Sequence, residues 1–199
     1  MDSETPPEHG HAWRKAERAR LIEARMAMSD ADHRAANAEI TRLLAERFPP
    51  SVLPMLGCYW PFRREYNCVP LMRRVIEEGG AVALPAVVGK QQPLEFRPWT
   101  PEAKMDPGVW NIPHPAEGPA VFPGALLIPV VGFDAKGYRL GYGAGFYDRT
   151  LAIFPRAPLT IGVGFELSRM DSIHPHTHDI PLDYIVTEAG ITHTAVAHI

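Results

Sequence analysis

The chain has 199 residues, of which 46% are hydrophobic, and this length and composition predict one folded domain whose core needs no disulfide bonds. The formal net charge of −3 argues against a nucleic-acid binder, which usually carries a strongly basic face. Cys58 and Cys68 are too few for a disulfide scaffold, so we expect reduced thiols in a cytoplasmic protein. No apolar run reaches the roughly 18 residues of a membrane span, so no membrane partner is expected.

Residues 1–11 are acidic and contain proline, unlike a signal peptide, and we expect a disordered tail there before one domain over residues 12–199. Beyond the tail, helical and strand-like segments alternate. Helices are predicted over residues 12–28, 30–48, 71–78 and 146–154, and strands over residues 55–59, 81–85, 125–131, 159–164 and 184–186. This alternation predicts an α/β fold of three layers, α/β/α, in which helices cover both faces of an open, mostly parallel sheet.

Seven prolines lie between positions 98 and 124. This density disfavours regular structure, because proline lacks the amide donor that helices and sheets use. We therefore expect a long ordered loop or flap there, beside the ligand site.

Three glycines alternate within residues 141–145, after the longest apolar run of the chain and before the predicted helix over 146–154. This order is typical of an anion cradle, because glycines let the backbone approach phosphate oxygens while free amides and the positive helix end face them. Arg139 and Arg149 bracket the loop with positive charge. A tight turn or a glycine-rich strand edge gives the same pattern, so the glycines alone leave both interpretations open.

Asp148 lies three residues after the last of these glycines, at the start of the predicted helix. A carboxylate beside bound phosphates should repel them unless it holds a cation that bridges to those phosphates. Alternatively, Asp148 is a first-turn acid that the helix dipole favours. Charge alone leaves both interpretations open.

Three histidines, His174, His176 and His178, alternate shortly before the predicted last strand. In a strand their imidazoles would share one face and could hold zinc. Pro175 within this run and Pro181 after it favour a loop instead, and no thiolate or further spaced histidine completes a ligand set.

The stretch over residues 133–149, FDAKGYRLGYGAGFYDR, resembles the signature of the 5-formyltetrahydrofolate cyclo-ligase family, and the similarity runs from about residue 14 to 187. The resemblance implies a fold like that of NagB, RpiA and the CoA-transferases. It also implies ATP- and magnesium-dependent cyclisation of 5-formyltetrahydrofolate to 5,10-methenyltetrahydrofolate, with release of ADP and phosphate through a phosphorylated formyl intermediate. ATP is then a co-substrate and Mg2+ is the cofactor. The folate substrate can be used with or without a polyglutamate tail. The protein is expected to be a monomer or a weak homodimer.

The resemblance also assigns residues. Catalytic roles fall on Arg139, Tyr147 and Arg149, and magnesium binding falls on Asp148 and Asp179. ATP binding is implied for Arg14, Lys15, Arg18, Arg139, Leu140, Gly141, Tyr142, Gly143, Ala144, Gly145, Phe146 and Tyr147. Folate binding is implied for Trp60, Glu65, Tyr142, Gly143, Ala144, Gly145 and Phe146.

Two of these assignments compete with structural interpretations. Arg14, Arg18 and Arg25 lie within about 40° of one another on the first predicted helix, and such a basic stripe is commonly a solvated face. The segment 60–65 is typical of a surface loop with aromatics anchored to the core. In the resembled family, however, a carboxylate at the position of Glu65 binds folate, and a carboxylate suits the adjacent N–H donors of a pterin.

Two other functional classes stay open. One is a different ATP-dependent enzyme of the same architecture, because a fold does not fix the chemistry. The other is a non-catalytic paralogue that binds folate or nucleotide. The presence of Glu65, Asp148 and Arg149 together counts against a non-catalytic protein.

Overall fold

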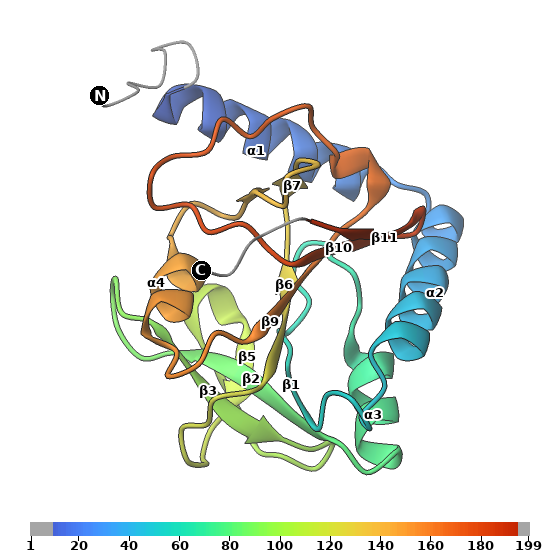
Figure 1. The fold of residues 1–199 in the computed structure, drawn as a ribbon, viewed down its shortest axis with the longest axis vertical. Helices are drawn as coiled ribbons and strands as arrows, with labels where there is room; N and C mark the ends of the chain where they lie inside the picture. The colour runs from blue at the N-terminus through green and yellow to red at the C-terminus, as the bar shows by residue number, and fades with distance from the viewer. Residues whose placement is uncertain (1–9, 195–199) are drawn as a thin grey trace.

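The computed structural model describes residues 10–194 and has an α/β fold built on a central sheet (Figure 1). Within these residues the sheet has seven strands: β1 (Met55–Gly57), β2 (Ala81–Val87), β3 (Leu94–Trp99), β6 (Ala125–Pro129), β9 (Leu159–Val163), β10 (Tyr184–Thr187) and β11 (Gly190–His193). Their order is β11-β10-β9-β6-β1-β2-β3. The inner strands run parallel, whereas β3 and β11 pair antiparallel at the edges, so the predicted mostly parallel sheet is confirmed.

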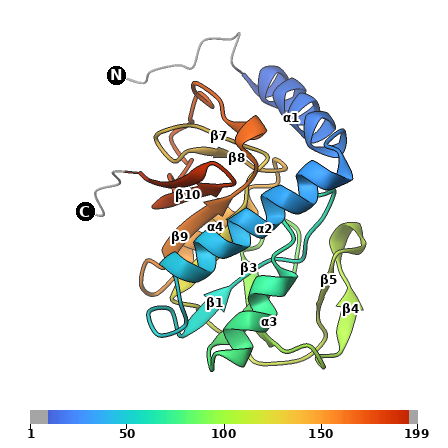
Figure 2. The same cartoon turned by 90° about the vertical axis from the view of Figure 1, so that its right-hand side faces the viewer.

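Helices cover both faces of the sheet, with α2 and α3 on one side and α4 on the other (Figures 1 and 2). The helices of the described residues are α1 (His11–Met26), α2 (Asp30–Arg47), α3 (Val69–Glu77) and α4 (Phe146–Ile153). Along β6, Leu127 packs in the apolar cluster that includes Ile40 of α2. Its neighbours Leu126 and Ile128 pack in the cluster on the α4 side, as the period of two in a strand requires. The predicted three layers are confirmed, and no helix within residues 10–194 is long and apolar enough to cross a membrane.

The carboxyl ends of the parallel strands lie at one end of the sheet, where such sheets bind ligands. There β1 leads into residues 58–65, and β6 leads into a hairpin of β7 (Gly132–Phe133) and β8 (Arg139–Leu140). The glycine loop, defined as residues 141–145, joins β8 to α4. Helix α1 lies across the same end, next to β7, where Leu21 closely approaches Gly132 (Figure 1). The fold therefore gathers four segments that are distant in the sequence.

Several predicted boundaries differ from the structure. Helix α1 begins at His11, inside the predicted disordered tail, whereas residues 1–9 and the end of the predicted domain, 195–199, lie outside the described residues. The edge strands β3 and β11 were not expected. Both follow short turns rather than crossover helices, so the alternation of helix and strand gives no sign of them. The charged residues and Pro98 of β3 are tolerated because the strand lies at an edge of the sheet.

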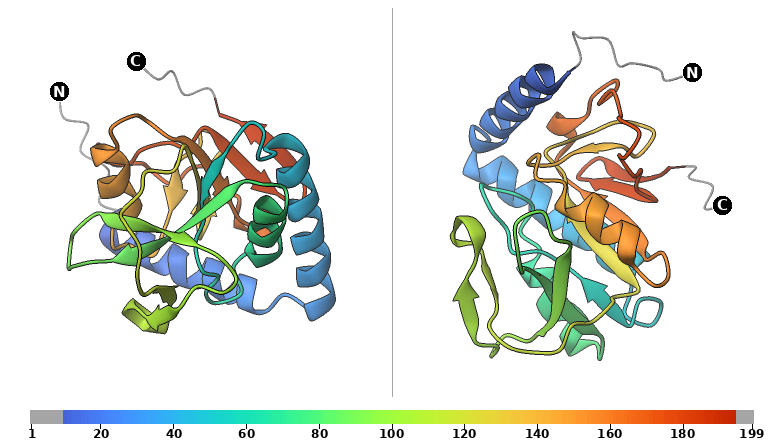
Figure 3. Two further views of the ribbon diagram at one scale, coloured as in Figure 1. Left: turned by 90° about the horizontal axis from the view of Figure 1, so that it is seen from below. Right: turned by 90° about the vertical axis from the view of Figure 1, so that its left-hand side faces the viewer.

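The proline-rich segment 98–124, predicted as a long ordered loop or flap, has more regular structure than its composition suggests. It contains a hairpin, in which β4 (Met105–Pro107) pairs antiparallel with β5 (Pro113–Pro115) across the short turn η2 (Val109–Asn111). Figures 2 and 3 show this hairpin beside the main sheet. Arg97 of β3 holds it there, since its Nη1 donates to the carbonyls of Pro115 and Ala116 at 3.1 and 3.3 Å. Proline fits these strands because they form a separate two-stranded sheet with little need for amide donors.

Candidate active site

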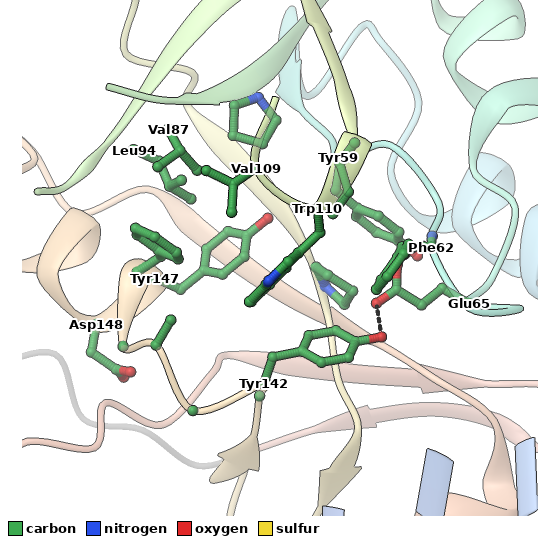
Figure 4. Close-up of a pocket in the computed structure, with 18 of the residues that line it drawn as sticks. Tyr59, Phe62, Glu65, Val87, Leu94, Val109, Trp110, Tyr142, Tyr147 and Asp148 are labelled. Atoms are coloured by element: carbon green, nitrogen blue, oxygen red, sulfur yellow. Dashed lines mark hydrogen bonds between the residues drawn. The ribbon is translucent and has the colours of Figure 1, made fainter. Parts of the chain in front are cut away.

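A cavity lies at the carboxyl end of the sheet, and most of the predicted site residues line it (Figure 4). Its wall contains Arg14, Arg18, Trp60, Glu65, Arg139, Gly141, Tyr142, Gly143, Ala144, Gly145, Phe146, Tyr147, Asp148 and Asp179. These residues come from α1, the segment after β1, the β8 hairpin strand, the glycine loop with α4, and the loop before β10. The tertiary fold thus brings together most of the residues that the resemblance assigns to nucleotide, folate and metal.

The glycine loop has a backbone that side chains would strain. Gly143 has φ +92° and Gly145 has φ +64°, in the left-handed region that favours glycine. Gly145 is the residue that precedes the first turn of α4, so the amides of that turn face the loop. Arg18 fixes the loop from α1, because its Nε donates to the carbonyl of Gly141 at 2.7 Å. Two of the three glycines thus have positive φ, and the loop forms part of the cavity wall.

Three arginines give this end of the cavity its positive charge. Arg14 and Arg139 are buried, and Arg18 is half-buried. Burial and the neighbouring charge of Arg14 lower the pKa of Arg18 below its ordinary value, although Asp179 acts in the opposite direction. An anion placed here would therefore relieve a local excess of positive charge.

Both predicted metal ligands are paired with these arginines. Asp148 accepts a hydrogen bond from Arg139 Nη2 at 2.9 Å, and Asp179 accepts one from Arg14 Nη2 at 2.5 Å. Burial acts to raise the pKa of Asp179, but the hydrogen bonds from Arg14 and the His176 amide outweigh it and hold that pKa below its ordinary value. Within residues 10–194, no group of three or more His, Cys, Asp or Glu side chains is placed to hold a metal ion.

Glu65 lies at the opposite end of the cavity and is 5% exposed. Its Oε2 accepts a hydrogen bond from the Phe62 amide at 2.9 Å, and its Oε1 accepts one from the Tyr142 hydroxyl at 3.0 Å (Figure 4). Burial raises the pKa of Glu65 to about 7, against the opposing effects of Arg25, the Phe62 amide and the Tyr142 hydroxyl. This carboxyl group therefore changes its charge near neutral pH.

Aromatic and aliphatic side chains that the sequence did not suggest complete the wall. The Phe62 ring lies nearly parallel to Trp110, with an interplanar angle of 11° and 6.4 Å between centroids. Trp110 projects from the β4–β5 turn, where its φ is +55°, and the residue is 54% exposed. Further unexpected wall residues are Tyr59, Val87, Leu94, Val109 and His114. The expected position of the proline-rich segment beside the ligand site is confirmed, because Val109, Trp110 and His114 of that segment line the cavity, although the sequence did not single out these residues.

Comparison with known proteins decides the family. Residues 10–188 match the model of the 5-formyltetrahydrofolate cyclo-ligase family. The chain belongs to this family. The family consists of ATP-dependent 5-formyltetrahydrofolate cyclo-ligases, which act in folate one-carbon metabolism.

Individual cyclo-ligases show the extent of the similarity. The 5-formyltetrahydrofolate cyclo-ligase of Mycolicibacterium smegmatis is 31% identical over 141 residues, which cover 65% of this chain and 71% of that protein. The Escherichia coli K12 cyclo-ligase is 28% identical over 162 residues, or 76% and 86% of the two chains. The solved structure of Aquifex aeolicus 5,10-methenyltetrahydrofolate synthetase superposes with a TM-score of 0.80 at 26% identity, covering 94% and 95% of the chains.

In this cyclo-ligase family member, three of the predicted site residues do not line the cavity. Leu140 is buried in the core. Arg149 turns back onto the loop, where its Nη2 donates to the carbonyl of Ala144 at 2.6 Å. Lys15 lines a separate surface groove beside Arg18 and Tyr142. Their assigned contacts with ATP or the reacting groups stay predictions.

Proposed function

We propose that this member of the cyclo-ligase family catalyses the ATP- and magnesium-dependent cyclisation of 5-formyltetrahydrofolate to 5,10-methenyltetrahydrofolate, with release of ADP and phosphate. The observation that carries the proposal is a single cavity with two chemically distinct ends. One end has a glycine loop and arginines that suit phosphates, and the other has a buried carboxyl group and aromatic rings that suit a pterin. Membership of the family supports this assignment.

The proposed chemistry explains why ATP is needed. The formyl group on N5 is an amide whose oxygen is a poor leaving group. Its oxygen attacks the γ-phosphorus, the bond from that phosphorus to the bridging oxygen breaks, and ADP leaves. The N10 lone pair then attacks the activated formyl carbon, N10 loses its proton, and the C–O bond breaks to release phosphate. The protein therefore has to align two substrates and neutralise charge more than it has to supply a strong base.

The phosphates of ATP are proposed to lie against the glycine loop. Backbone amides near Gly143 and Gly145 can approach phosphate oxygens because no side chain intervenes. Arg14, Arg18 and Arg139 face the same space and offer charged donors. We assign to Arg139 the stabilisation of the transferring phosphoryl group, and to Tyr147 contact with the reacting groups, since both side chains line the cavity.

The pterin is proposed to lie at Glu65. In its ionised form this carboxylate can accept two adjacent N–H groups of the pterin, and each of its oxygens has lone pairs beyond those used by Phe62 and Tyr142. Trp60 and Trp110 line the same cavity and offer apolar surface for the ring system. Removal of water by these rings would strengthen the bonds to Glu65.

Asp148 and Asp179 would hold the magnesium ion. Both line the cavity, and they are close neighbours in the fold because the amide of Ile180 lies 3.4 Å from Asp148 Oδ1. Mg2+ is commonly bound by one or two carboxylates together with substrate phosphates and waters, so two carboxylates beside the glycine loop fit this ion. When bound, magnesium supplies charge neutralisation to the phosphates.

The test is an absorbance assay for the methenyl-folate chromophore. Purified protein, 5-formyltetrahydrofolate, ATP and magnesium should together produce the band, and omission of ATP should abolish it. Failure to form the band over a range of pH and metal concentration would refute the proposed activity. Thermal stabilisation by either ligand without turnover would instead favour a non-catalytic binding protein.

A further inference from the structure

Tyr142 belongs to both ends of the cavity at once. Its backbone lies within the glycine loop, between Gly141 and Gly143, where Arg18 holds the chain. Its side chain extends away from the loop, and its hydroxyl donates to Glu65 Oε1 at 3.0 Å (Figure 4). A single residue therefore connects the proposed phosphate cradle with the proposed pterin carboxylate, which lies 77 positions earlier in the chain.

Arg25 of α1 determines the direction of that hydrogen bond. Its Nη2 donates to the Tyr142 hydroxyl at 2.7 Å. Because a guanidinium can only donate, the hydroxyl accepts from Arg25, and when Glu65 is ionised the hydroxyl directs its own proton to that carboxylate. Arg25 is 2% exposed, so water does not compete effectively for this arrangement. The order of donors is thus Arg25 to Tyr142 to Glu65.

Arg25 also holds the segment that carries Glu65. Its Nε donates to the carbonyl of Arg63 at 3.0 Å. Arg63 and Arg64 have φ of +48° and +56°, a backbone that non-glycine residues rarely adopt and that persists only where neighbours hold it. Arg64 is tied in turn to Asp30 Oδ1 at 2.8 Å and to the carbonyl of Met28 at 3.0 Å. The Glu65 segment is therefore anchored to the helical layer independently of the glycine loop.

Two aromatic rings restrict the Tyr142 ring. Phe62 and Trp110 each lie with their centroids 6.0 Å from that of Tyr142, at interplanar angles of 58° and 55°. The ring cannot swing freely, so a displacement of the glycine loop backbone must move the Tyr142 hydroxyl relative to Glu65.

We propose that Tyr142, oriented by Arg25, is a positioning residue that couples the two substrate sites, so that nucleotide on the glycine loop increases the affinity of the Glu65 end for folate. The inference rests on the proposed function. Contacts between phosphates and the loop backbone order residues 141–143 and thereby the hydroxyl that holds Glu65 ready to accept the pterin donors. Because the second ligand then binds to an already ordered site, the coupling is positive. Reciprocity requires folate to increase the affinity for nucleotide by the same factor.

The experiment measures 5-formyltetrahydrofolate binding by calorimetry with and without magnesium and an ATP analogue whose γ-phosphoryl group cannot be transferred. For the wild-type protein we expect the analogue to lower the folate Kd at least ~5-fold, the lower end of typical coupling factors. Tyr142→Phe keeps the ring and removes only the hydroxyl, so the factor should fall below about 2 while the Kd for the analogue alone stays within about twofold. Arg25→Gln should reduce the factor similarly, and the double variant should lose no more than either single one.

Two matched variants control for general effects. Tyr138→Phe removes a tyrosine hydroxyl from the β7–β8 turn, away from the cavity wall, and Arg20→Gln removes an α1 arginine that pairs with Glu17 on the helix surface. Both should keep the wild-type coupling. A wild-type factor near 1, or a factor that survives in Tyr142→Phe, overturns the coupling while leaving the proposed activity intact. Wild-type protein that binds neither ligand overturns the proposed function, and the coupling with it.

Discussion

At the glycine-loop end of the cavity, Asp148 and Asp179 are each paired with an arginine, whereas at the other end Glu65 is held by a tyrosine hydroxyl and a backbone amide. The guanidinium groups of Arg139 and Arg14 place a positive charge directly beside these two carboxylates, and for Asp179 the hydrogen bond from Arg14 helps to hold the pKa below its ordinary value. Burial instead brings the pKa of Glu65 to about 7, so its charge depends on the conditions. We call the glycine-loop end the fixed end, because its two carboxylates are held in ion pairs, and the Glu65 end the proton-dependent end, because protonation changes its charge near neutral pH.

The fixed end is tested most severely by Asp148→Asn. The asparagine keeps the shape of the side chain but removes the charge proposed to anchor magnesium, so the rate of methenyl-folate formation should fall by at least ~100-fold with the fold intact. Raising magnesium should recover part of the loss by mass action. Asp171→Asn, at an exposed aspartate off the cavity wall, is the control and should be silent.

Two outcomes would contradict the metal role. A near-normal rate at limiting magnesium would make Asp148 a first-turn acid that contributes only ~0.3–1 kcal/mol to stability through the helix dipole. A large loss that magnesium does not recover would instead assign to Asp148 the positioning of Arg139, its partner at 2.9 Å.

The loop backbone provides the next largest effect. Gly143→Ala and Gly145→Ala each place a methyl group at positive φ, which costs roughly 1–2 kcal/mol unless the loop leaves its conformation. We expect KM for ATP to rise about tenfold, since each ~1.4 kcal/mol is a factor of ten. Gly79→Ala is the matched control, because Gly79 has φ +86° with open space around it and lies at the end of α3. If all three variants lower only the melting temperature, the tight-turn interpretation of the glycines holds.

The proton-dependent end should respond to pH. If the pterin needs the ionised form of Glu65, the Kd for 5-formyltetrahydrofolate without nucleotide should rise about tenfold from pH 8 to pH 6, because the competent fraction falls by that factor around a pKa of about 7. Glu65→Gln should bind folate more weakly, with no such dependence, and leave ATP binding unchanged. Glu117→Gln, at an exposed position, should retain the wild-type profile. A pH-independent wild-type Kd would show that Glu65 is not the folate ligand.

The same group also links folding to pH. Its pKa in the folded protein lies above its ordinary value of 4.5, so the folded state binds the proton more tightly than the unfolded state. This contribution to the free energy of unfolding is complete below about pH 4.5 and is lost as the pH rises through about 7. Denaturant titrations should show this decrease in wild-type protein and a smaller one in Glu65→Gln. If the free energy of unfolding changes equally with pH in both proteins, Glu65 is ionised over the whole pH range.

Local chemistry explains which features the sequence could predict. The glycine loop was recognisable because its backbone conformation, with φ of +92° and +64°, favours glycine, and the sequence shows directly where glycines stand. The parallel sheet followed from alternating helices and strands. The β4–β5 hairpin could not be predicted, because its strands are short, rich in proline, and held in place by Arg97 from a strand that was itself unrecognised. Trp110 lies in the turn of that hairpin, so its place in the cavity wall could not be predicted either.

The hydrogen-bond partners of the α1 arginines could not be predicted from the sequence either. Arg14 and Arg18 were seen as one stripe with Arg25, but their separate partners, Asp179, Gly141 and Tyr142, depend on how α1 crosses the sheet. Periodicity places side chains on one face of a helix and says nothing of what that face meets.

The smallest expected loss of activity is that of an Arg149 variant, although the sequence analysis gives Arg139 and Arg149 the same catalytic role. Arg139 lines the cavity, whereas Arg149 lies over the Phe146 ring at 5.4 Å and holds the Ala144 carbonyl from behind the loop. We expect Arg149→Gln to reduce kcat less than ~5-fold, since it loses one hydrogen bond of roughly 1 kcal/mol to the loop backbone. Arg139→Gln removes a buried charge from the proposed phosphate site and should lower kcat at least ~100-fold. Parallel steady-state assays of the two variants test the difference. Equal losses would mean that Arg149 swings into the cavity when ATP binds and takes the catalytic role that the family resemblance assigns to it.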